Sequence, residues 1–136
     1  MTEKAKLVTG ILLITIPTIQ YGGYFLLRVL SRKEGVNLTD FQKSMFRAGH
    51  AHAGVLVIFA ILAQLLIDNI TASSAIQELL RSGFPIAAIL VSGGFFAAAA
   101  GKNRTTLNSW VFVLYLGIAV LAVSTVTLGI TLINSR

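Results

Sequence analysis

The sequence contains no cysteine. This absence excludes disulfide bonds, thiolate metal sites and covalent haem attachment through a cysteine pair. It leaves the redox compartment open. Any metal or haem ligand must therefore come from another side chain, and the chain has only two histidines.

Charged residues are also scarce. They make up 12% of the 136 residues, whereas about a quarter of a soluble domain is charged. The chain is 55% hydrophobic with a mean hydropathy of +0.81, which excludes an ordinary water-soluble domain. Four stretches lack Lys, Arg, Asp and Glu, and each reaches the ~20 residues that a helix needs to cross a bilayer: 7–27, 48–67, 82–101 and 105–135. Continuous apolar runs of this kind do not match the alternating pattern of a membrane barrel.

These runs predict an all-α integral membrane protein in contact with the lipid bilayer. Thr39 and Gln42 have the spacing of a capping box, which predicts a helix beginning near Asp40. Pro17 predicts a kink in the first span. Residues 71–83 are expected to form a loop that can hold a short amphipathic segment around residues 76–80. The first run continues without a small-residue cleavage site, so we interpret it as a retained span rather than a signal peptide. The expected fold is one domain, an antiparallel four-transmembrane-helix bundle with helices at about residues 7–30, 40–69, 84–101 and 108–133.

The net charge of +6 does not indicate nucleic-acid binding, because the basic residues sit in short loops beside the spans. The first and third loops carry Arg28, Arg32, Lys33, Lys43, Arg47, Lys102 and Arg104. The termini and the second loop carry Lys4, Lys6, Arg81 and Arg136. The positive-inside rule then predicts both termini outside, in a bacterial cytoplasmic membrane. The bias is moderate, so dual topology stays open as the alternative.

A weak internal repeat links the two halves of the chain. Two glycines followed by aromatic residues at 21–25, then a basic loop and a polar cap, recur at 92–96 with a second basic loop and cap. The pattern favours two tandem helical hairpins in the same orientation. Chance matching of glycines and aromatics is the alternative. In this repeat the position equivalent to His50 is Ala119, so only one half carries a histidine.

Both histidines belong to one motif, Arg47-Ala48-Gly49-His50-Ala51-His52-Ala53-Gly54, at the start of the second span. Ionisable side chains in hydrocarbon cost several kcal/mol unless they are paired, so they are candidates for function. Residues two apart on a helix point about 200° apart, so His50 and His52 cannot face the same partner helix. A polar stripe at alternating spacings of four and three predicts that His50 faces inward and His52 faces another helix or a second subunit. The stripe consists of Lys43, Arg47, His50, Gly54, Val57, Ile61, Gln64 and Asp68.

All three tyrosines fall at the depth of the histidines, given a rise of about 1.5 Å per helical residue. We therefore predict one polar ligand-binding pocket open to the cytoplasm, formed by His50, His52, Tyr21, Tyr24, Gln20, Tyr115 and Arg47. Three alternatives stay open. The tyrosines can be interfacial aromatics, a histidine can make a structural interhelical hydrogen bond, and the glycines can serve only close helix approach.

The eight-residue histidine motif resembles a run found in uncharacterised small bacterial four-helix membrane proteins. The likeness extends to residues 17–23 and 41–43. Over a short stretch the motif is also distantly similar to the His-x-His helices in the catalytic subunits of haem-copper oxidases and nitric oxide reductases. That second resemblance implies haem or copper ligation by histidine. This chain departs from those enzymes because both of its histidines lie on one helix, so a complete oxidase site is excluded.

Three functions compete on this evidence. The first is binding of haem or a transition metal with His50 as metal ligand, since neutral imidazole suits iron, copper and zinc. Two axial histidines would require a homo-oligomer in which each chain gives one. The second is a proton- or solute-conducting transporter or channel along His50, Gln64 and Asp68, although Val57 and Ile61 predict a dry middle. The third is an accessory subunit of a larger membrane complex. An enzyme has the least support, because no acidic residue lies at the histidine depth.

Overall fold

The structure is a computed structural model that describes residues 1–31 and 37–135. Three residues of the charge count, Arg32, Lys33 and Arg136, and most of the predicted first loop lie outside the described residues. The four helices are α1 (Glu3–Leu30), α2 (Asp40–Ile67), α3 (Ser74–Ala98) and α4 (Val111–Asn134). Each is long and apolar enough to cross a membrane, which confirms the prediction of a four-span, all-α membrane protein.

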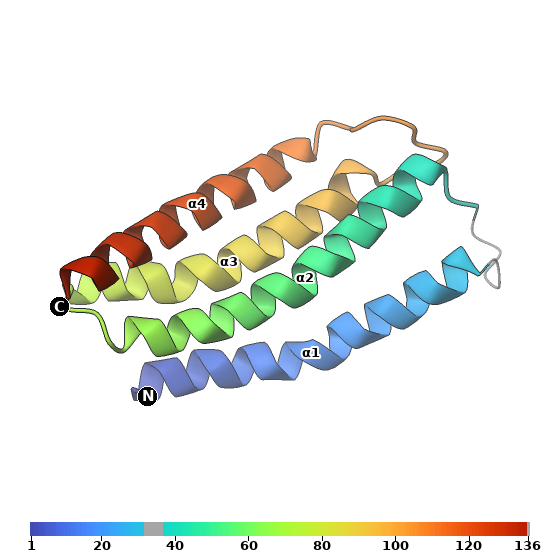
Figure 1. Ribbon diagram of the computed structural model, residues 1–136. Coiled ribbons are helices and arrows are strands. Elements are labelled where there is room, and N and C mark those ends of the chain that lie inside the picture. Colours follow the sequence, from blue (N-terminus) through green and yellow to red (C-terminus); the bar gives the residue numbers. More distant parts are fainter. Residues whose placement is uncertain (32–36, 136) are drawn as a thin grey trace.

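The helices lie side by side in chain order and run antiparallel, with α1 and α4 at opposite edges (Figure 1). The antiparallel packing is therefore confirmed. The two termini lie at the same end of the molecule, beside the α2–α3 loop (Figure 1). The most extensive contact joins α3 and α4, followed by α2 and α3, whereas α1 packs mainly on α2 and barely contacts α3. The largest fully buried apolar side chains, Ile67, Leu80 and Phe84, lie between α2 and α3.

The predicted capping box at the start of α2 is confirmed. The Thr39 hydroxyl accepts from the Gln42 N–H at 3.2 Å, and the Gln42 Oε1 accepts from the Thr39 N–H at 3.2 Å. The Gln42 side chain is buried, and its Nε2 also donates to the carbonyls of Ala99 at 3.0 Å and Gly101 at 2.8 Å. One side chain thus caps α2 and holds the α3–α4 loop against it.

Helix α3 begins ten residues before the span that the apolar run predicts. Ser73 caps it by accepting from the Ile76 N–H at 3.4 Å, so most of the predicted 71–83 loop is helical. The charged residue that interrupts the apolar run, Arg81, is buried within this helix. Its partners, described below, explain why the helix continues through it.

Small residues allow α3 and α4 to pack closely. A Cβ added at Gly94 would lie 2.6 Å from the Leu114 backbone, and one added at Gly83 would lie 2.4 Å from the Ser124 hydroxyl. Close approach through small residues is the usual basis of helix association in membranes. The α1–α2 contact is much less extensive, so the two hairpins are not equivalent in packing, and their origin by duplication stays a prediction.

Candidate functional site

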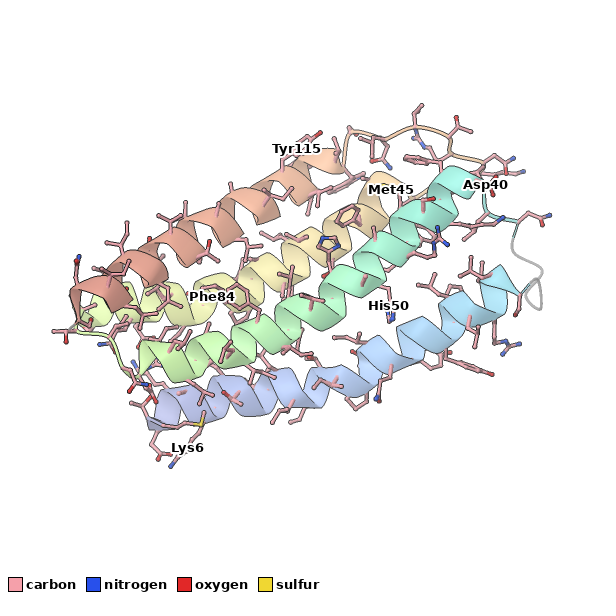
Figure 2. All side chains as sticks on the ribbon, viewed as in Figure 1. Lys6, Asp40, Met45, His50, Phe84 and Tyr115 are labelled. Carbon is pink, nitrogen blue, oxygen red and sulfur yellow. The ribbon has the colours of Figure 1, made fainter. Side chains whose placement is uncertain are left out.

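The His50 side chain extends from α2 toward α1 (Figure 2). It lies against two consecutive glycines of α1. A Cβ added at Gly23 would come within 2.8 Å of the His50 Nε2, and one added at Gly22 would lie 3.8 Å from its Nδ1. The imidazole therefore occupies space that exists because Gly23 has no side chain.

A cavity of about 170 Å³ adjoins the His50 ring. Gln20 of α1 and Gly54 of α2 line it together with His50, and a Cβ added at Gly54 would meet nothing within 4 Å. Gln20 and His50 are its two strongly polar side chains. The other walls are aliphatic and consist of Ile16, Ile19, Val57 and Ile58.

The two histidines differ in their bonding. The Nδ1 of His52 hydrogen-bonds the Ala48 carbonyl at 2.8 Å, and its ring packs on Phe95 of α3 with centroids 4.9 Å apart. Among the described residues, His50 has no hydrogen bond or ion pair. The sequence-based expectation that they face different helices agrees with these contacts. His52 is satisfied within its own helix, and His50 is half-buried and unpaired.

The tyrosines and Arg47 do not line the His50 cavity. Tyr21 and Tyr24 lie exposed on α1 with their rings 6.5 Å apart, and the Arg28 guanidinium lies 5.8 Å from the Tyr24 ring. Tyr115 is exposed on α4, which packs on α3. It therefore lies at the opposite edge of the layer from α1, toward which His50 extends (Figure 2). Shared depth therefore did not bring these side chains together, and of the predicted set only Gln20 shares the His50 cavity.

A second polar group lies at the opposite end of α2. The fully buried Gln64 donates from Nε2 to the Arg81 carbonyl at 3.1 Å, and its Oε1 accepts from Arg81 Nη1 at 3.4 Å. Arg81 Nη2 donates to Asp68 Oδ1 at 2.5 Å. Gln64 and Asp68, the residues predicted for a conducting path, are thus both engaged with Arg81.

This Arg81 network also holds the start of α1. The Thr2 N–H donates to Asp68 Oδ2 at 2.7 Å, and the Thr2 hydroxyl donates to Asp68 Oδ1 at 2.9 Å. A more exposed ion pair joins Lys4 to Glu78. Asp68 follows the last residue of α2. Its burial raises its pKa, but hydrogen bonds from Arg81 and Thr2 and the charge of Arg81 outweigh burial and lower the pKa to about 2.

Sequence reasoning did not identify Arg81 as a buried residue. The signal was present, because Asp68 ends the second span and Arg81 begins the third on the same side of the membrane. Buried charges within membrane proteins are almost always paired, so a lone Asp and a lone Arg at neighbouring span ends predict each other.

The described residues hold no group of three or more His, Asp or Glu that could bind a metal ion together. The His50 cavity offers one imidazole and one amide as donors. Closed protein zinc sites have four protein ligands, and open catalytic sites have three, so the two donors at this cavity are fewer than either kind of site uses.

Comparisons with known proteins found no relative of the chain. No family model, curated protein or solved structure matches the chain. The resemblance carried by the histidine motif therefore stays a prediction.

Proposed function

We propose that this four-span membrane protein binds a neutral, lipid-soluble ligand through a hydrogen-bonding oxygen at the His50 cavity. The observation that carries the proposal is the unpaired imidazole, whose ring occupies space left by Gly23, beside a cavity that Gly54 helps to line. An unpaired polar group costs about 1–3 kcal/mol when it is fully buried, and His50 is half-buried, so a ligand that completes its hydrogen bonds would recover part of that cost.

The two polar side chains define the chemistry of the ligand. Neutral imidazole offers one N–H donor and one nitrogen acceptor, and the Gln20 amide offers two N–H donors and one carbonyl acceptor. A carbonyl or hydroxyl oxygen complements both. Because the remaining walls are aliphatic, an apolar ring that bears such oxygens fits better than a polar solute. A quinone is one chemical class with these properties.

A metal ion or haem has less support at this cavity. The acidic residues at the two ends of α2 are Asp40, its first residue, and Asp68, which follows its last, and they lie ten and eighteen residues from His50, or about 15 Å and about 27 Å along the helix. A divalent cation there would be desolvated without an anionic ligand, which is strongly unfavourable. Haem with two axial histidines would need a second copy of the chain, because His50 is the one histidine that lines the cavity.

The orientation of the cavity rests on charge alone. The bias of basic residues toward the first and third loops supports a cytoplasm-facing cavity with both termini outside. Assembly with a second copy or within a larger membrane complex is compatible with the proposal, because α1 and α4 each leave one edge of the layer open (Figure 1).

Binding to the protein in lipid nanodiscs tests the proposal, with a decyl-substituted benzoquinone as the probe. We expect His50→Ala to weaken binding roughly tenfold, which corresponds to the loss of about one hydrogen bond. His52→Ala is the matched control, because His52 is exposed and bonds its own helix, and it should leave binding unchanged. Equal binding by His50→Ala and the wild type would overturn the proposal.

Two neighbouring glycines provide a second matched pair. Gly23→Ala puts a methyl group 2.8 Å from the His50 Nε2 and must displace the ring, whereas Gly22→Ala makes an ordinary contact at 3.8 Å. We therefore expect Gly23→Ala to reduce probe binding as His50→Ala does, and Gly22→Ala to retain it. The reverse order would contradict the assigned ring position.

A conducting path has one observation in its favour and two against it. Ile19 and Val57, which line the His50 cavity, also line a neighbouring hollow of about 350 Å³ between α1, α2 and α3. However, Gln64 and Asp68 bond Arg81, and Val57 lies between the His50 cavity and the far end of α2. Proton flux in proteoliposomes that falls in His50→Ala would favour conduction over binding alone.

A further inference from the structure

A pocket of about 470 Å³ lies between the first halves of α1 and α3, at the end of the molecule that carries both termini (Figure 1). Its polar lining consists of Lys4 of α1 and of Glu78, Arg81 and Ser82 of α3. The other five lining residues are apolar. We call this cavity the Arg81 pocket.

Polar and apolar residues are separated along the pocket. Because neighbouring helices are antiparallel, α1 and α3 run in the same direction (Figure 1). On both helices the charged lining residues come first, and apolar residues such as Leu7 and Ile86 follow deeper in the span. From Glu78 to Ile86 the pocket runs eight residues along α3, or about 12 Å, which fits within one half of a hydrocarbon core about 30 Å thick. A membrane phospholipid has the same order, with its phosphate at the surface and its chains inside.

Arg81 brings hydrogen-bond donors to this pocket that the protein leaves unused. Its side chain is buried, with 4% of the residue exposed. A guanidinium has five N–H donors, and among the described residues Arg81 uses two, one on the Gln64 Oε1 and one on the Asp68 Oδ1. Lys4 has three N–H donors and pairs with Glu78. The pocket therefore lacks acceptors rather than donors.

The two cations are already balanced in charge. Asp68 pairs with Arg81, and Glu78 pairs with Lys4. The pocket therefore favours a group that accepts several hydrogen bonds over one that carries a large negative charge. A phosphodiester has this character, because it carries a single negative charge and two free oxygens, and phosphate oxygens match the planar fork of an arginine.

We propose that the Arg81 pocket binds a membrane phospholipid, whose phosphodiester accepts hydrogen bonds from Arg81 and Lys4 and whose chains begin along the apolar wall. The four apolar spans put the pocket in contact with the bilayer, so phospholipid is the molecule that surrounds it. Basic pockets between transmembrane helices commonly bind lipid headgroups. The pocket shares no described residue with the His50 cavity, so this inference does not rest on the proposed function.

Native mass spectrometry of the protein released from nanodiscs tests the proposal, with phosphatidylglycerol and a diacylglycerol of the same chains as probes. The diacylglycerol keeps the chains and removes the phosphate. We expect the adduct of one phosphatidylglycerol per chain to survive roughly tenfold more than the diacylglycerol adduct, because only the phosphodiester satisfies the buried donors.

Two lysines provide a matched pair of variants. Lys4 lines the pocket and pairs with Glu78, whereas Lys6 lies outside it and pairs with Glu3. Their side chains are similarly exposed, 68% for Lys4 and 58% for Lys6. Because Lys4 is exposed, we expect Lys4→Gln to lower retention of phosphatidylglycerol only about threefold, and Lys6→Gln to leave it unchanged.

A second pair of variants fills the pocket without touching the Arg81 network, which the fold needs. Ile86→Trp adds bulk to the apolar wall of the pocket, and Ile130→Trp adds the same bulk on an exposed face of α4. We expect Ile86→Trp to lower retention of phosphatidylglycerol roughly tenfold through overpacking, and Ile130→Trp to retain it.

Three results would overturn the proposal. Equal retention of diacylglycerol and phosphatidylglycerol would show that only the apolar wall binds lipid. Displacement of the lipid by millimolar inorganic phosphate would assign the pocket to a soluble anion. A lipid-free dimer that Ile86→Trp dissociates would show that a second copy of the chain covers the pocket.

Discussion

Replacing Asp68 by Asn tests how the Arg81 network stabilises the fold. The ion-paired side chains are only 5% exposed for Arg81 and 11% exposed for Asp68. Lowering the pKa of Asp68 from 3.8 to about 2 corresponds to roughly 2 kcal/mol in favour of the ionised, folded form. Removing one partner of a buried pair typically costs about 3–5 kcal/mol. Because Asn keeps an oxygen that can accept from Thr2 and Arg81, we expect a loss of about 2–3 kcal/mol.

The assay is reversible unfolding in detergent micelles followed by circular dichroism. Glu78→Gln is the matched control, because it removes the same charge from the nearby pair with Lys4, whose side chains are 68% exposed for Lys4 and 51% exposed for Glu78. Exposed pairs contribute about 0–1 kcal/mol. If Asp68→Asn lowers the free energy of unfolding no more than Glu78→Gln does, the buried Arg81–Asp68 pair stabilises the fold no more than an exposed ion pair, and the reasoning is refuted.

A double variant separates the ion pair from the rest of the site. If Asp68 and Arg81 act together, Arg81→Leu should cost less in the Asp68→Asn background than in the wild type. Additive losses would assign the stability to the separate contacts of each side chain with Thr2 and Gln64.

Two further predictions concern other contacts, and a third concerns the pH dependence of Asp68. Gly94→Ala should destabilise the protein by about 1–3 kcal/mol in the same unfolding assay, because its Cβ would lie 2.6 Å from the Leu114 backbone. Gly93→Ala, which meets nothing within 4 Å, should be neutral or slightly stabilising; equal losses in the two variants would contradict the close α3–α4 packing. Gln42→Leu removes the bonds to the α3–α4 loop and the cap bond to Thr39, and should cost about 1–3 kcal/mol, with faster hydrogen exchange at residues 99–110 and at the start of α2; uniform exchange would argue against this role. The folded-state pKa of Asp68 lies below 3.8, so its contribution to stability is complete above that pH and is lost as the pH falls through about 2. Acid titration of unfolding should show this loss in the wild type and not in Asp68→Asn.

Features that depend on one helix were predictable from the sequence. The four spans follow from the length and composition of the apolar runs, and the capping box at Thr39 and Gln42 follows from a fixed local spacing. The different surroundings of His50 and His52 follow from helical geometry, since residues two apart cannot share a face.

Features that depend on the neighbour of each helix were not predictable in the same way. Tyr115 has the depth of His50, but depth does not say which helices lie between them, and α3 separates them. Arg81 interrupts an apolar run, so composition alone predicts a loop there, whereas its pairing with Asp68 and Gln64 allows a buried helix. The room for the His50 ring depends on Gly23 of a different helix, which no local pattern indicates.

The most direct test of the central claim is nitrogen NMR of ¹⁵N-imidazole-labelled histidine in nanodiscs, titrated with the decyl-substituted benzoquinone. The chain has only two histidines, so His50→Ala and His52→Ala assign both sets of signals. We expect the ring nitrogens of His50 to shift and saturate as the probe binds, while those of His52, already bonded to the Ala48 carbonyl, stay unchanged. A titration that shifts His52 alone, or leaves both histidines unchanged, would contradict the assignment of His50 as the ligand-binding residue.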